Sequence, residues 1–117
     1  MALPTRAELK RDVARHYELI RRYARQTSRS FYSYGWLLDI ARGIYTLRTG
    51  RVAAKTAAGD WALAQGLCPV PEELAAALEV RKNPEKYRDN PATFDRAETL
   101  GPAVQRFADV LERELEK

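Results

Sequence analysis

The sequence has almost none of the residues that form covalent or metal crosslinks. Its 117 residues include one cysteine, Cys68, and one histidine, His16. A lone cysteine excludes an internal disulfide and fits the reducing environment of the cytoplasm. One cysteine and one histidine also leave no ligand set for Zn²⁺. No apolar run approaches the roughly 20 residues that span a bilayer, and the N-terminus turns polar too early for a secretory signal. We therefore expect a cytoplasmic protein with no membrane segment and no metal ligands.

Motifs that carry catalysis are also missing. The sequence contains no P-loop motif, no G-x-G-x-x-G and no G-x-S-x-G. No closely spaced acidic pair follows a strand-like run, as a Mg²⁺ site for nucleotidyl transfer requires. We interpret His16, which has no nucleophilic partner, as a packed or half-exposed side chain, and Cys68 as a small buried apolar one. The chain alone is therefore not expected to be catalytic.

Charge is distributed unevenly along the chain. Residues 1–55 hold twelve Lys and Arg against four Asp and Glu, whereas residues 56–117 hold eight against twelve. A basic half favours an anionic partner such as a nucleotide, RNA or an acidic protein surface. The alternative is that arginine-rich faces only keep a small helical protein in solution.

Hydrophobic periodicity favours helices along the whole chain. No segment alternates strictly enough for a strand, and apolar residues recur every three or four positions. We predict an all-α fold in which residues 1–117 form one domain, a compact bundle of about five mostly antiparallel helices. The predicted helices cover approximately residues 5–26, 31–49, 55–65, 71–82 and 91–116. Gly101-Pro102 predicts a kink or a break in the last of these, because proline lacks a backbone donor. Residues 83–90 are expected to form a polar loop or a short helical turn.

One corner of the predicted bundle gathers cations. Arg42 lies on the second predicted helix, Gly50 ends that helix, and Lys55 begins the third. A helix N-terminus offers unpaired N–H groups and a partial positive charge, so it favours anions. A lysine at this end is electrostatically unfavourable unless an anion binds beside it. The pattern therefore predicts a phosphate-binding corner. The alternatives are an ion pair between Arg42 and Asp39, or another carboxylate, and a solvated Lys55.

The same segment resembles a known family. The matching residues stand between Gly35 and Leu63, in the order Ala41-Arg42, Tyr45-Thr46-Leu47, Thr49-Gly50, Lys55, Ala57-Ala58 and Asp60-Trp61-Ala62. This order resembles the C-terminal helical domain of bacterial aminoglycoside adenylyltransferases of the streptomycin/spectinomycin-resistance type. The resemblance is tight over this segment and continues loosely to the last helix. It implies a helical fold like the substrate-binding domains of nucleotidyltransferases, and it is not a catalytic signature.

The resemblance implies a role beside a catalytic domain. In the family, an N-terminal nucleotidyltransferase domain holds Mg²⁺ and transfers AMP from ATP to a drug hydroxyl, and the helical domain closes the far wall of the cleft. Nothing in this chain matches that catalytic domain, so a truncated piece, a split subunit or a remnant is expected. ATP and Mg²⁺ are then held mainly by the partner domain. By motif position, Arg42 and Lys55 correspond to phosphate contacts, and Tyr87 matches a tyrosine near the nucleotide in a loosely aligned loop.

The acceptor side departs from the family. There, an aromatic residue and acidic residues just ahead of the second helix meet the cationic aminoglycoside. Here the segment 23–34, YARQTSRSFYSY, has no carboxylate and carries Arg25 and Arg29. Tyr23, Tyr32 and Tyr34 are candidates for stacking on a sugar or a base. The expected acceptor is an aminoglycoside-like or other small molecule.

Two other function classes stay open. A pI of about 9.4 and tyrosines interleaved with arginines favour a nucleic-acid-binding or RNase-like helical module. Against an RNase, His16 directly follows Arg15, whereas small helical RNases of the toxin type place an Arg and a His a few residues apart on one helix. Nucleic acid is therefore the less favoured partner. A helical scaffold without a ligand is also consistent with this fold.

Overall fold

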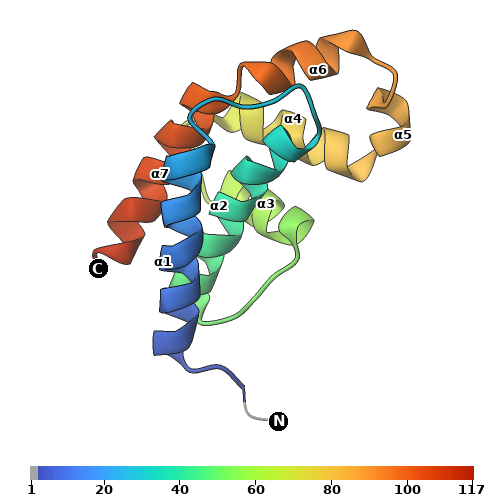
Figure 1. The fold of residues 1–117 in the computed structure, drawn as a ribbon. Helices are drawn as coiled ribbons and strands as arrows, with labels where there is room; N and C mark the ends of the chain where they lie inside the picture. Colours follow the sequence, from blue (N-terminus) through green and yellow to red (C-terminus); the bar gives the residue numbers. More distant parts are fainter. Residues whose placement is uncertain (1–2) are drawn as a thin grey trace.

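Helices account for all regular secondary structure between residues 3 and 117, which are the residues that the computed structural model describes. They are α1 (Arg6–Tyr23), α2 (Tyr32–Thr49), α3 (Lys55–Ala64), α4 (Pro71–Lys82), α5 (Pro84–Tyr87), α6 (Pro91–Glu98) and α7 (Gly101–Leu115) (Figure 1). The all-α bundle predicted from the sequence is confirmed, with seven helices in place of about five. Over the same residues, no helix has both the length and the apolar character that a membrane crossing needs.

Helix α1 begins at a capping box. The Thr5 hydroxyl accepts a hydrogen bond from the Glu8 N–H at 3.1 Å, and the Glu8 carboxylate accepts one from the Thr5 N–H at 3.4 Å. These two bonds satisfy donors that the first turn of a helix leaves free. One face of the helix then buries Leu9, Val13 and Ile20 against its neighbours. The sequence signal therefore fixes both the start of α1 and the face that it buries.

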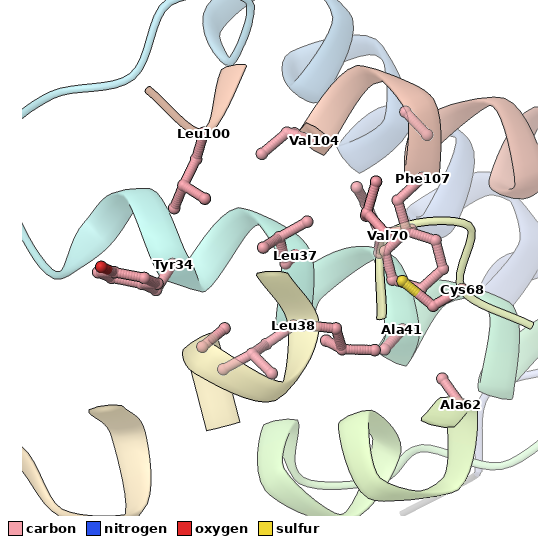
Figure 2. Close-up of a cluster of buried hydrophobic side chains, with 14 of the residues drawn as sticks. Tyr34, Leu37, Leu38, Ala41, Ala62, Cys68, Val70, Leu100, Val104 and Phe107 are labelled. Atoms are coloured by element: carbon pink, nitrogen blue, oxygen red, sulfur yellow. The ribbon is translucent and has the colours of Figure 1, made fainter. Parts of the chain in front are cut away.

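Helix α2 lies at the centre of the molecule. It contacts α1, α3, α4 and α7, and it buries residues around most of its circumference, as expected for a helix that several neighbours surround. Figure 2 shows four of its side chains, Tyr34, Leu37, Leu38 and Ala41, among residues from the rest of the core. Because α2 is held on several sides, its charged residues have fixed positions on which a binding site can be built.

The predicted last helix is two helices, and residues 83–90 contain a short one. Helix α6 ends at Glu98, and α7 begins at Gly101 with Pro102 in its first turn, where a missing N–H costs nothing. Gly101 is required by close packing: a Cβ there would lie 2.0 Å from the carbonyl oxygen of Arg25. The chain thus breaks at the predicted Gly101-Pro102 position because α7 starts against the backbone of the α1–α2 loop.

Part of the charge asymmetry is neutralised by ion pairs between the two halves of the chain. Arg21 on α1 forms ion pairs with Asp109 and Glu112 on α7, at 2.6 and 3.3 Å. Arg48 on α2 pairs with Glu114 at 2.7 Å. The basic first half of the chain therefore packs against the acidic second half. This pairing reduces the positive charge available for a nucleic acid.

Candidate functional site

The connector between α2 and α3 folds back along α2. Gly50 ends α2 with a positive φ of 73°, which favours glycine, and its N–H donates to the Thr46 carbonyl at 2.8 Å. Further along, the Nε of Arg42 donates to the carbonyl oxygen of Ala53 at 3.1 Å. The connector is therefore tied to α2 by the side chain of Arg42. As a result, α3 begins beside the middle of α2 (Figure 1).

Lys55, the first residue of α3, packs against the face of α2 that carries Arg42. Its ammonium Nζ is 3.2 Å from Oδ1 of Asp39, and the two side chains are 27% and 25% exposed. Gly35 lies one turn before Asp39, and a Cβ at Gly35 would be 3.7 Å from the same Nζ. Since residues 35, 39 and 42 recur at helical spacing, they form one stripe on α2. The structure thus brings the two predicted phosphate contacts together around Asp39.

The contacts of the two cations differ from the alternatives derived from the sequence. Asp39 pairs with Lys55 and not with Arg42, so Lys55 is not a freely solvated side chain. Within residues 3–117, Arg42 forms no ion pair, and it is held in place by a carbonyl oxygen. Its Nε is therefore occupied, while the remainder of the fork-shaped guanidinium stays available to an anion.

The N-terminus of α3 adds donors to this corner. Ala54 stands at its N-cap and provides no capping hydrogen bond from its side chain. No side chain at the N-cap therefore accepts a hydrogen bond from the N–H groups of the first turn. These N–H groups also form the positive end of the helix dipole. Lys55 adds its own positive charge at the same end. The Asp39 carboxylate offsets this unfavourable combination, and a phosphate would offset it in the same way.

A cavity of about 200 Å³ lies next to Arg42, between α1, α2 and the connector. Its wall combines apolar side chains with four ionisable ones, Asp12 and His16 from α1 and Asp39 and Arg42 from α2. His16 is exposed at this wall. The arrangement suits a small ligand with both an apolar part and charged groups.

A second cavity, of about 360 Å³, has Gly35 in its lining. It lies between α2, the first residues of α3 and the end of α4, and its lining includes Thr56, Arg81 and Lys82. Arg81 and Lys82 give no distinctive signal in the sequence, because basic residues in the last turn of a helix are ordinary partners of its dipole. Only the position of α4 beside α2 places these cations near the Lys55 corner.

Tyr87 contacts α4. Its hydroxyl donates to the Glu79 carboxylate at 3.0 Å, and the ammonium of Lys86 lies 5.4 Å from its ring centre. Tyr87 lines neither of the two cavities described above. The structure therefore gives it a contact within the bundle that accounts for its position without a nucleotide.

The three candidate acceptor-binding tyrosines have different surroundings. Tyr23 and Tyr32 are 59% and 86% exposed, whereas Tyr34 is 3% exposed. The Tyr34 hydroxyl donates to the Thr93 carbonyl at 2.6 Å, and burial raises the pKa of this tyrosine. Arg29, from the same segment, is paired with Asp95. Two of the three rings are thus available to a ligand, while the third is part of the core (Figure 2).

Comparison with protein families gives one match. A family model described as "Aminoglycoside adenylyltransferase, C-terminal domain" matches residues 7–114. The match covers α2, the connector and α3, which form the corner, together with nearly all of the remaining bundle. Comparison with curated proteins and with solved structures gave no match.

Proposed function

Because the chain belongs to the family of aminoglycoside adenylyltransferase C-terminal domains, we propose that it forms the helical wall of a cleft for ATP and an acceptor. A nucleotidyltransferase domain, which this chain does not contain, would supply the opposite wall and carry out the chemistry. The chain would then bind and orient substrates without being catalytic by itself. The observations that support this proposal are that Arg42 donates to the connector just before α3 and that Lys55 pairs with Asp39, one turn before Arg42 on α2.

The chemistry of the corner fits a nucleoside triphosphate. A triphosphate carries several negative charges, and a planar guanidinium can bind two oxygens of a phosphate while an ammonium acts as a point charge. The uncapped N-terminus of α3 adds backbone donors beside them. When bound, ATP would supply the adenylyl group that the catalytic domain transfers. In this account, Arg42 and Lys55 would hold the phosphates in position.

The catalytic Mg²⁺ would be held by the partner domain. No group of three or more His, Cys, Asp or Glu side chains with metal-binding geometry lies within residues 3–117. For the acceptor we propose Tyr23 and Tyr32, whose exposed rings stand at the end of α1 and the start of α2. Tyr34 is left out because its ring is buried. Tyr87 is proposed as a neighbour of the nucleotide on the family resemblance alone.

Nuclear magnetic resonance on isotope-labelled protein tests the proposal. ATP is titrated into the chain alone, and then into the chain mixed with a nucleotidyltransferase domain of the family. We expect the side-chain signals of Arg42 and Lys55 to shift in both titrations, and those of Arg113, which is exposed on α7, to stay in place. If the Arg42 and Lys55 signals do not move in either titration, the phosphate role is wrong. A salt-dependent gel shift with unspecific RNA would instead favour the nucleic-acid alternative.

A further inference from the structure

Lys55 already has an anionic partner in the protein itself. The Asp39–Lys55 pair is about three-quarters buried, with side chains 25% and 27% exposed, and its atoms are 3.2 Å apart. Asp60 and Lys82 form a pair of the same chemical type between α3 and α4, at 2.9 Å, but these side chains are 54% and 45% exposed. Water weakens the interaction of the second pair far more than that of the first. Asp39 therefore neutralises Lys55 more effectively than Asp60 neutralises Lys82.

We infer that Asp39 is a positioning residue: its carboxylate holds the Lys55 ammonium in an ion pair until a polyphosphate displaces the carboxylate. The inference rests on the proposed function, because it concerns the same phosphate corner. A phosphate oxygen that binds Lys55 must take the place of the Asp39 carboxylate or share the ammonium with it. The carboxylate also lies on the α2 face that the phosphate approaches, so it repels the incoming anion. Both effects lower the affinity of the corner for phosphate.

One effect of Asp39 acts in the opposite direction. By holding the Lys55 side chain against Gly35, the carboxylate reduces the rotamer entropy that the lysine loses when a ligand binds. For charges about 4 Å apart near a protein surface, the Coulomb energy exceeds the rotamer entropy of a lysine side chain. The lysine is also anchored at the start of a helix, close to α2. Neutralisation is therefore the larger effect, and removal of the carboxylate is expected to strengthen phosphate binding.

The structure separates this effect from the role of Arg42. Arg42 is held by the Ala53 carbonyl and not by Asp39. A change of Asp39 to asparagine keeps the size of the side chain, removes its charge and leaves the hydrogen bond between Arg42 and the connector in place. The change in phosphate affinity then reports the release of Lys55.

The test measures binding of tripolyphosphate, with and without Mg²⁺, to the full chain and its variants at low ionic strength. Asp39→Asn is expected to raise the affinity about tenfold, which corresponds to about 1.4 kcal/mol of binding free energy. Asp109→Asn on α7 is the matched control, because it removes the same charge while Arg21 keeps Glu112 as a partner, and less than a twofold change is expected. Asp39→Glu restores the charge and should bring the affinity back toward that of the unchanged chain.

A second measurement does not depend on a variant that folds. In the unchanged chain, tripolyphosphate should shift the side-chain carboxyl carbon signal of Asp39 as Lys55 leaves it, and the signal of Asp109 on α7 should not move. Combining Asp39→Asn with Lys55→Gln should abolish the gain in affinity. If Lys55→Gln weakens binding while Asp39→Asn leaves it unchanged or lower, the inference is overturned and the proposed function stands. If Lys55→Gln has no effect on binding, the proposed phosphate role fails, and the inference fails with it.

Discussion

The guanidinium of Arg48 on α2 donates two hydrogen bonds to one carboxylate oxygen of Glu114 on α7, from Nε at 3.0 Å and from Nη2 at 2.7 Å. Glu114 is 8% exposed and also accepts a bond from Lys117 at 2.9 Å. Burial alone would raise the pKa of Glu114, but the hydrogen bonds from Arg48 and Lys117 outweigh it and hold the pKa below its ordinary value of 4.5. The contact therefore links the two halves of the chain in a way that depends on pH.

The first prediction concerns acid stability. Because the pKa of Glu114 is lower in the folded than in the unfolded chain, its contribution is fully present above pH 4.5 and is lost as the pH falls through the folded value. Glu114→Gln should reduce the free energy of unfolding at pH 7 by about 1–2 kcal/mol, since Arg48 is partly exposed and regains water. Urea unfolding between pH 3 and pH 7 measures this. Equal pH profiles for the two proteins would contradict the assignment.

The second prediction concerns Cys68. Burial raises the pKa of its thiol from 9.0 to about 11, so at pH 8 the folded chain holds about a hundredfold less thiolate than the unfolded chain. A chromogenic disulfide reagent should therefore react at least about tenfold more slowly with native protein than with protein in urea, because the greater nucleophilicity of a high-pKa thiolate offsets only part of the loss. A native rate close to the unfolded rate would show that the thiol is accessible. No variant is needed, because the unfolded chain is its own control.

The third prediction compares two glycines in helices. Gly101→Ala would place a Cβ 2.0 Å from the Arg25 carbonyl oxygen, so the start of α7 must move, and we expect a loss of about 3 kcal/mol or more. Gly35→Ala would place a Cβ in ordinary contact with Lys55, at 3.7 Å. Because alanine favours a helix by roughly 1 kcal/mol over glycine, the second variant should be unchanged or more stable. Thermal unfolding of both variants measures the difference. Similar losses of unfolding free energy would contradict the close packing at Gly101.

The fourth prediction separates two neighbouring tyrosines. Tyr34→Phe removes the donor to the buried Thr93 carbonyl and should cost about 1–2 kcal/mol of unfolding free energy. Tyr32→Phe should change stability by less than about 0.5 kcal/mol, since this side chain is 86% exposed. Chemical denaturation of the pair measures the difference. If the two changes prove equal, Tyr34 does not have the core role that its burial indicates.

The contrast between these tyrosines shows what could be predicted from the sequence. Tyr34 stands three, four and seven residues before Leu37, Leu38 and Ala41, so helical periodicity alone places it on the buried face of α2. Composition alone groups the three tyrosines of segment 23–34, and composition does not distinguish core from surface. The start of α1 and the break before α7 were predictable, because a capping box and a proline act within a few residues.

The partner of Lys55 could not be predicted in the same way. Asp39 lies three residues before Arg42, and sequence spacing made this pair the natural alternative. The connector instead brings Lys55 back to Asp39 across a chain reversal, and local spacing does not contain that information. Arg81 and Lys82 were missed for the same reason, because their distance from the corner depends on how α4 packs against α2. Long-range packing therefore determines the electrostatic detail of the site.

The central claim is that Arg42 and Lys55 together bind nucleotide phosphates, and calorimetry with ATP on three single variants tests it most directly. Arg42→Gln and Lys55→Gln should each weaken binding about tenfold, as expected when one charge-assisted hydrogen bond is lost. Arg113→Gln, which removes an exposed charge of the same sign on α7, should change the affinity less than twofold. If all three variants bind ATP as the unchanged chain does, or lose affinity equally, these two cations do not form a phosphate site.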